Sequence, residues 1–314
     1  MTTNKTNLRA LYEDARLLLK DTPESIIRLN NCCRNQRTHY VLINDHIGDV
    51  VVALGYLKAF RDKYSISSLT LVIHKKYESF ARRYAKYIDE LILLEQRDLY
   101  RLFLIGATRY GEWVLKNSFP NVTIINPADS FLGGFDYAKR YPEITLTDMI
   151  KYGCLGLERN AEFISPSQGQ SGKNDEKNVL FTTSARTLDC DVMDVCNKIA
   201  PILVNNGYRL YTNTSDSSVI VNRSKKVFFD IEEIADFISD GIVIGPRSGI
   251  HDLSMYCSCT TIAIYPQAST EKSLFVLSAL PDANSNYYEL DQSQDVQKDC
   301  ERILEYLRGE HKFD

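Results

Sequence analysis

Residues 239–266 read "SDGIVIGPRSGIHDLSMYCSCTTIAIYP" and contain, in order, an apolar run, a loop, a helical stretch and a second apolar run. The two runs, "GIVIG" (241–245) and "TTIAIYP" (260–266), have the length and the β-branched composition of buried strands. The helix between them begins near residue 249, within the loop "GPRSGIHD" (245–252). A strand, a helix and a second strand in this order predict two parallel strands joined by a crossover.

The same alternation extends over the rest of the second half of the chain. The other strands predicted here are 178–184, 208–213, 225–230 and 287–290. The predicted helices are about 190–206, 231–238, 249–257, one from about 270, and about 293–309. Short apolar strands that alternate with helices are typical of a parallel sheet covered on both faces.

The first half of the chain repeats this pattern. Its predicted strands are 39–44, 69–74, 90–95 and 121–126. Its predicted helices are about 7–31, 48–64, 77–88 and 97–117. The helix over 7–31 has leucines at helical spacing, and we expect it to pack against the first domain; a membrane-surface or oligomer helix is the alternative.

A polar segment separates the two halves. Residues 164–177, "ISPSQGQSGKNDEK", lack apolar periodicity and are typical of an interdomain linker. The sequence therefore predicts an α/β protein with a helical extension (1–38) and two Rossmann-like domains (39–163 and 178–314) whose parallel sheets face a central cleft. Ligands bind at the carboxyl ends of the strands in open parallel sheets, so the loops at those ends are the candidates for chemistry.

Composition limits the class of protein. The 314 residues are 44% hydrophobic and 25% charged, as in ordinary soluble globular proteins. The net charge is −4, and no basic concentration of the kind that nucleic-acid binding requires is present. No apolar run reaches the roughly 18 to 20 residues of a membrane-spanning helix, so we expect a cytoplasmic location.

The eight cysteines show neither CxxC spacing nor an accompanying histidine cluster. We therefore predict neither a disulfide framework nor a zinc site, and no other metal site or cofactor. Reduced, mostly buried cysteines are the expectation.

Two loops carry the candidate chemistry. In "GPRSGIHD", Ser248 and Gly249 precede a helix whose N–H groups could receive a phosphate, although Ser-Gly is also an ordinary helix start. In "NDHIGDVVV" (44–52), Gly48 allows a tight turn and Asp49 opens the next helix. Asp49 is a candidate general base, and a helix-capping carboxylate is the alternative.

These two loops together resemble glycosyltransferase family nine, the lipopolysaccharide heptosyltransferases. The family begins with a strand and an Ile-Gly-Asp turn, which Ile47-Gly48-Asp49 reproduces. Late in the chain it has the pattern A-D-L-V-I-G-N-D-S-G-P-M-H-L, to which "SDGIVIGPRSGIHDL" (239–253) is similar without a gap. The resemblance implies a GT-B fold, in which two Rossmann-like domains form one enzyme.

The resemblance also implies a reaction. It is an inverting transfer of a hexosyl or heptosyl group from a nucleotide-sugar, with no cofactor, to a hydroxyl of a surface polysaccharide or glycoconjugate such as lipopolysaccharide or capsule. By position, Asp49 matches the catalytic aspartate, and Ser248 and Gly249 match the diphosphate-binding pair. The sequence departs from the family pattern at Arg247, which replaces aspartate, and at Asp252, which replaces histidine.

The remaining site residues follow from the chemistry. Without a metal, the departing diphosphate needs positive charge, and a guanidinium can bind two phosphate oxygens at once. Arg247 and Arg186 are the candidates for this role, with Ser184 near Arg186. The resemblance adds Thr212, Asn213, Asp230 and Glu232, which stand where a GT-B enzyme commonly contacts ribose and base. His251 and Asp252 either contact the donor, with Asp252 also able to orient Arg247, or simply form the first turn of the helix. The candidates for the acceptor side are Gly48, His46 and Tyr265.

The expected partners are a nucleotide-sugar donor and a glycan or lipid-linked glycan acceptor. The tract "HKKYESFARRYAKY" (74–87) interleaves basic and aromatic residues, so it could hold the protein at an anionic lipid surface; a solvated helix face is the alternative. Two other functions stay open: a nucleotide-sugar epimerase or other GT-B enzyme, and a non-catalytic partner protein on the same scaffold.

Overall fold

The computed structural model describes residues 16–127, 143–166, 177–185, 190–229, 231–238, 240–267 and 272–311. The chain divides into two compact units, Met1–Ile164 and Ser165–Asp314, which are considered separately below. Within the described residues, no helix is both long and apolar enough to cross a membrane.

The first unit contains a parallel sheet of four strands in the order β3-β2-β1-β4. These are β1 (His39–Ile43), β2 (Leu69–His74), β3 (Glu90–Leu94) and β4 (Val122–Ile125). Each lies inside a predicted strand, because short apolar runs between polar loops bury both faces of a parallel strand.

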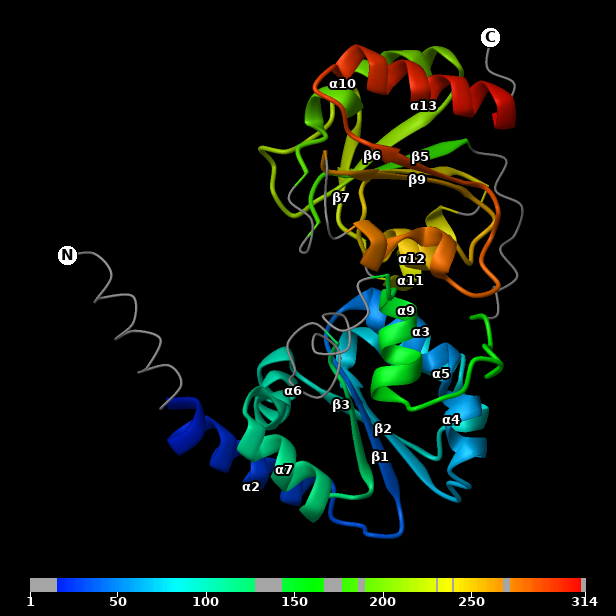
Figure 1. Cartoon of the computed structure of the whole chain (residues 1–314). Coiled ribbons are helices and arrows are strands. Elements are labelled where there is room, and N and C mark those ends of the chain that lie inside the picture. Colours follow the sequence, from blue (N-terminus) through cyan, green and yellow to red (C-terminus); the bar gives the residue numbers. More distant parts are fainter. Residues whose placement is uncertain are drawn as a thin grey trace, which may run out of the picture. The chain divides into compact units, whose positions relative to one another are not determined.

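Helices cover both faces of this sheet (Figure 1). On one side lie η1 (Leu17–Asp21), α2 (Thr22–Cys32), α6 (Gln96–Phe103), η4 (Leu104–Ala107) and α7 (Arg109–Ser118). Figure 1 shows α3 (Ile47–Gly55), α4 (Leu57–Lys63) and α5 (Glu78–Arg82) on the other side. The short segments η2 (Lys75–Tyr77), η3 (Ala85–Tyr87), α9 (Leu146–Asp148) and η5 (Met149–Cys154) complete the described part. Leu29 of α2 is fully buried in the core of this unit, as expected for a helix that packs on the domain.

The second unit contains a parallel sheet of six strands in the order β10-β9-β8-β5-β6-β7. They are β5 (Asn178–Thr182), β6 (Arg209–Asn213), β7 (Lys225–Val227), β8 (Ile242–Pro246), β9 (Thr260–Tyr265) and β10 (Tyr287–Asp291). Figure 1 shows α10 (Met193–Asn205) and α13 (Val296–His311) on one face, and α11 (Ile231–Phe237) and α12 (Gly249–Ser254) on the other. The two parallel sheets confirm the α/β fold predicted from the alternation.

In each sheet there is one place where the order in which the chain adds strands changes from one side of the sheet to the other. In the first sheet β2 and β3 lie on one side of β1 and β4 lies on the other, so the reversal is at β1 and β4. In the second sheet it is at β5 and β8 for the same reason. Crossovers leave on opposite faces at such a switch point, which opens a crevice beyond the carboxyl ends of the two strands.

The helix predicted from about residue 270 is wrong. The described chain there forms two short 3₁₀ turns, η6 (Lys272–Phe275) and η7 (Leu277–Ala279). The carbonyl of Phe275 accepts hydrogen bonds from Arg247 and Tyr265, and the N–H of Leu277 donates to Glu289. These tertiary contacts use backbone groups that an α-helix would pair within itself.

The helix predicted over 48–64 is two helices. It breaks at Tyr56, where the carbonyl of the preceding Gly55 accepts the N–H of Ile164 at 2.8 Å. A Cβ at Gly55 would lie 2.0 Å from the ring of Phe163, so the close approach of this segment requires glycine.

Candidate functional site

Three buried polar residues meet at the switch point of the first sheet. Asn44 follows β1, Asn126 follows β4, and Asp49 lies in the first turn of α3. The amide Nδ2 of Asn44 donates to Asp49 Oδ2 at 2.6 Å and to Asn126 Oδ1 at 3.0 Å. An amide nitrogen has two hydrogens, so these two bonds use both and fix the Asp49 carboxylate, which is only 4% exposed.

The local sequence explains this placement. Asn44 Oδ1 accepts the N–H of His46 at 3.2 Å, a turn that asparagine side chains favour, and α3 begins directly afterwards at Ile47. The buried Gly48 lets the helix begin close to the sheet. Asp49 then stands among the N-terminal N–H groups of α3, where a negative charge is favoured. The sequence-predicted His46 belongs to the same cluster: its Nδ1 lies 3.5 Å from Asp49 Oδ2, and its side chain is 32% exposed.

Cys154, at the end of η5, lies near this cluster. Burial, with the negative charge of Asp49 as the next cause, raises the pKa of its thiol to about 12. The thiol is therefore neutral at physiological pH and adds no second negative charge beside Asp49.

The switch point of the second sheet carries two unpaired hydroxyls. Within the described chain, Thr182 Oγ1 and Thr183 Oγ1 are buried and have no hydrogen-bond partner, and Thr182 is 2% exposed. The end of β8 approaches β5 closely here, because a Cβ at Gly245 would lie 2.0 Å from Thr182 Oγ1. Such orphaned hydroxyls are rare in folded proteins, and a catalytic role or a bound ion is among their explanations.

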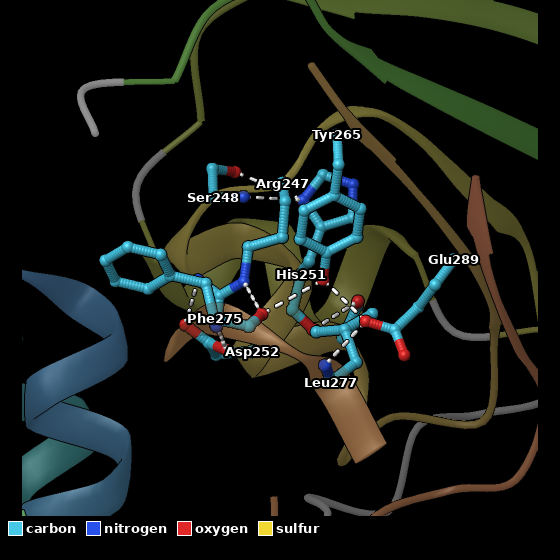
Figure 2. Close-up of polar contacts among 9 residues, drawn as sticks. Arg247, Ser248, His251, Asp252, Tyr265, Phe275, Leu277 and Glu289 are labelled. Atoms are coloured by element: carbon cyan, nitrogen blue, oxygen red, sulfur yellow. Dashed lines mark hydrogen bonds and ion pairs between the residues drawn. The ribbon is translucent and has the colours of Figure 1, made fainter. Parts of the chain in front are cut away.

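Arg247, directly beyond β8, is already engaged (Figure 2). Its Nη1 donates to Asp252 Oδ2 at 3.0 Å, its Nη2 to Asp252 Oδ1 at 2.5 Å, and its Nε to the carbonyl of Phe275 at 2.8 Å. Arg247 is 6% exposed and Asp252 is fully buried. The guanidinium and carboxylate therefore form a bidentate buried ion pair. The diphosphate contact predicted for Arg247 stays a prediction, and it requires exchange of these bonds.

Tyr265, at the end of β9, is buried in the second unit and shares the carbonyl of Phe275 with Arg247. Its hydroxyl is 2.6 Å from Glu289 Oε1 and 3.0 Å from the carbonyl of Phe275, and Leu277 donates its N–H to the same Glu289 oxygen (Figure 2). Burial, with the negative charge of Glu289 as the next cause, raises the pKa of the phenol. The residue predicted to border the acceptor thus anchors the η6–η7 segment to the sheet.

His251 and Ser248 form the start of α12. The N–H of Ser248 donates to His251 Nδ1 at 3.2 Å, and His251 Nε2 donates to the carbonyl of Ile262 at 3.2 Å. Burial lowers the pKa of His251 to about 3, and the charge of Arg247 adds to the effect. A neutral imidazole with its proton on Nε2 therefore joins β8, α12 and β9, while Ser248 and Gly249 remain partly exposed.

The other predicted nucleotide-side residues fall into three groups. Thr212 is fully buried, and its hydroxyl lies 2.6 Å from Ser224 Oγ and accepts the N–H of Val221. Asn213 Oδ1 accepts the N–H of Phe229 at 3.1 Å. Ser184 is exposed beyond β5. Arg186, Asp230 and the side chain of Glu232 lie outside the described residues.

Sequence reasoning missed Asn44, Asn126, Thr182 and Thr183. The available signal was their position, because each stands at the carboxyl end of a strand that the sequence predicts. Within the described residues, no three His, Cys, Asp or Glu side chains gather as a metal site requires. Independence from metal stays a prediction.

Comparison with known proteins adds to this geometry. No protein-family model matches the chain, and no curated protein sequence matches it. Several solved structures do match. The E. coli ADP-heptose LPS heptosyltransferase II superposes with a TM-score of 0.56 at 11% identity, over 86% of this chain and 98% of that one. E. coli heptosyltransferase WaaC, solved with ADP, gives a TM-score of 0.51 at 11% identity, over 86% and 98%.

A glycosyl transferase family 9 protein from Veillonella parvula DSM 2008 also matches, with a TM-score of 0.50 at 14% identity, over 88% of this chain and 92% of that one. Identities this low establish the architecture alone. The chain therefore has the GT-B fold of these glycosyltransferases, as the sequence predicted.

Proposed function

We propose that this protein is an inverting glycosyltransferase that moves a sugar from a nucleotide-sugar to a hydroxyl of a surface polysaccharide or glycoconjugate. The observation that carries the proposal is the pair of orphaned threonine hydroxyls at the second switch point. Thr182 is the last residue of β5 and Thr183 follows it, while Ser248 and Gly249 follow the neighbouring strand β8. Hydroxyls and helix N–H groups together suit a phosphate. Structural relatives have been solved with ADP and with ADP-D-β-D-heptose.

Asp49 is the proposed general base. Asn44 occupies its Oδ2, which directs Oδ1 toward the proton of the acceptor hydroxyl. As that proton leaves, the acceptor oxygen forms a bond to the anomeric carbon, and the bond from this carbon to the diphosphate oxygen breaks. The electron pair leaves with the nucleoside diphosphate, and a single displacement inverts the anomeric centre.

The departing diphosphate needs compensation for its charge. Ser248, Gly249 and the two threonine hydroxyls offer hydrogen bonds, and Arg186 is the proposed cation. Arg247 acts through its ion pair with Asp252, which holds the loop that carries Ser248 in place. No metal takes part in this scheme.

The test is a binding experiment with a Thr182→Val/Thr183→Val double variant. We expect the wild type to bind at least one nucleoside diphosphate or nucleotide-sugar by calorimetry. The variant should bind it at least tenfold more weakly, because each lost hydrogen bond to a charged ligand contributes about 1.5–3 kcal/mol. Removal of two unsatisfied buried hydroxyls should also leave the free protein equally or more stable toward urea. Unchanged affinity in the variant, or no binding across the adenine, guanine, uridine and thymidine series, would contradict the proposal.

Turnover is tested separately with Asp49→Asn. We expect this variant to retain nucleotide affinity and to lose transfer to the acceptor. Nucleotide binding by a wild type that transfers no sugar would instead indicate a non-catalytic protein.

A further inference from the structure

The exposed apolar side chains of the described residues are concentrated on one helical layer. Five of the eight large ones belong to η1, α2, α6 and α7, which cover a single face of the first sheet (Figure 1). We call them the aromatic face: Leu19, Ile27, Tyr100, Tyr110 and Trp113. Trp113 is the only tryptophan of the chain, and it is 60% exposed. Scattered apolar residues on a surface are ordinary, but a concentration on one layer indicates an interaction surface.

These side chains point away from the core because of helical periodicity. Leu29 of α2, Leu99 of α6 and Leu115 of α7 are buried in the core that these helices share with the sheet. Residues on the opposite sides of the same helices therefore face outward from one layer. On α7, the rings of Tyr110 and Trp113 stack with centroids 6.4 Å apart and an angle of 18° between their planes.

The charge of this layer is positive. Residues 16–32 and 96–118, which include these helices, contain seven Lys and Arg but only four Asp and Glu. Three of the four acids are in ion pairs within the layer, where Asp21 pairs with Arg16 and both Glu24 and Asp98 pair with Arg28. Lys20, Arg97, Arg109 and Lys116 are exposed, and none of them forms an ion pair with a carboxylate of the described residues.

The basic tract over 74–87 differs in this respect. Lys75 pairs with Glu95 at 2.6 Å, Lys76 with Asp45 at 2.6 Å, and Arg82 with Glu78 at 2.5 Å. Three of its five cations are thus compensated by carboxylates of the same unit, and its rings are buried or half-buried. The aromatic face, and not this tract, combines exposed rings with uncompensated positive charge.

We propose that the aromatic face binds the surface of an anionic lipid bilayer. Tryptophan and tyrosine settle at the boundary between headgroups and acyl chains, because they have apolar rings and polar edges. Lysine and arginine beside them are attracted to acidic headgroups. A second copy of the chain fits less well, since a twofold contact through this face would bring two positive layers together.

The test is sedimentation of the full chain with lipid vesicles. We expect binding to phosphatidylglycerol vesicles at low salt, weaker binding at high salt, and little binding to phosphatidylcholine vesicles. Two double variants probe the face, Tyr110→Ser/Trp113→Ser for the rings and Arg109→Gln/Lys116→Gln for the charge. Each should weaken binding roughly tenfold or more. Phe228→Ser is the matched control, because Phe228 is an exposed ring of the other unit.

The variants change exposed residues, so circular dichroism and urea unfolding should match the wild type. Three outcomes would overturn the inference. They are equal binding to neutral and acidic vesicles, equal loss of binding in Phe228→Ser, and a wild-type dimer that dissociates on Tyr110→Ser/Trp113→Ser without any vesicle binding. Nucleotide affinity is measured on the same samples. A wild type that binds no nucleotide would contradict the proposed function, whereas the vesicle experiment tests the lipid-binding inference independently of that result.

Discussion

Asn44 illustrates how much a single side chain decides in this protein. It connects the ends of two strands to the carboxylate proposed as the base, and both of its amide hydrogens are used. The sequence shows an asparagine at the end of two predicted strands, 39–44 and 121–126. It does not show that these strands are neighbours, because strand order arises from crossovers that composition does not encode. The contact between Asn44 and Asn126 could therefore not be predicted, although the sequence shows each asparagine at the end of a predicted strand.

Asn44→Ala should lower kcat by about ten- to a hundredfold, with little change in the KM for the donor, because Asp49 loses the bond that orients it. Asn121→Ala is the matched control: Asn121 Nδ2 donates to the carbonyl of Thr38 at 2.8 Å, at the amino edge of the same sheet. Its kcat should be unchanged. Steady-state kinetics with both variants decide the matter, and equal losses of kcat would point to a purely structural role for Asn44.

The buried imidazole of His251 gives stability a defined pH dependence. Its pKa is about 3 in the folded protein, against about 6.5 for an exposed histidine. Between these values the unfolded chain binds one proton more at this residue, so the free energy of unfolding falls as the pH decreases, by about 1.4 kcal/mol per pH unit. In the His251→Gln variant this residue binds no extra proton on unfolding, so this part of the pH dependence is absent. Urea unfolding from pH 7.5 to 4.5 should show its stability converging on that of the wild type, and parallel curves would contradict the assignment.

At the scale of elements, the sequence predicted all ten strands of the described residues, because most of them are apolar runs between polar loops. It failed at η6–η7, whose backbone bonds go to Arg247, Tyr265 and Glu289. Leucine and phenylalanine at helical spacing favour a helix locally, and these distant partners override that preference. The contact of Arg247 with the Phe275 carbonyl was hidden for the same reason, since Phe275 lies far along the chain, whereas its pairing with the nearby Asp252 was among the predictions.

The ion pair and the η6–η7 segment should behave as one unit. Arg247→Met or Asp252→Leu alone leaves one buried charge without its partner, which should cost about 3–5 kcal/mol of unfolding free energy. The double variant replaces both charges by apolar groups and should be more stable than either single variant. A double-mutant cycle in guanidinium chloride measures the coupling. Additive losses would show that the pair is not coupled in solution.

The contact between β5 and β8 depends on Gly245. Gly245→Ala places a Cβ 2.0 Å from Thr182 Oγ1 and 2.1 Å from the Thr182 carbonyl oxygen, so the strand ends must separate. We expect a loss of about 1–3 kcal/mol in stability, together with weaker nucleotide binding. Gly309→Ala is the control, because a Cβ there meets nothing within 4 Å, and it should be neutral or stabilising. Thermal unfolding of both variants, with and without nucleotide, tests this; an unaffected Gly245→Ala would contradict the close approach.

At the scale of the whole molecule, each unit has its own core. One apolar cluster runs from Leu29 to Ile124 and the other from Val179 to Leu307, and each lies within a single unit. The sequence predicted two domains from composition around 164–177, and the boundary between the two compact units, at Ile164 and Ser165, falls at the start of that segment. The fold class could be predicted from the periodicity of the sequence. To predict which side chains meet at the switch points, the order of the strands in each sheet would have had to be known.

Two cores predict two unfolding transitions in a calorimeter. A bound nucleotide should stabilise residues 165–314 by about 2.7 kcal/mol at a hundredfold excess over Kd, and the midpoint temperature of their transition should rise accordingly. The other transition should not move. The Thr182→Val/Thr183→Val variant identifies the transition of residues 165–314, because the nucleotide should no longer raise the midpoint of that transition. A nucleotide that raises both midpoints equally would show that the two units unfold together.

The pairing of Arg247 with Asp252 constrains how this loop can arise from the pattern it resembles, which has aspartate and histidine at the two positions. Changing the first position alone would join arginine to histidine, and changing the second alone would join two carboxylates. Arginine beside histidine would lack a negative partner, and two carboxylates would repel each other, in a space that is almost without water. A loop of this kind therefore tolerates Arg247 only together with a carboxylate at position 252, and the two positions should vary together wherever this loop occurs.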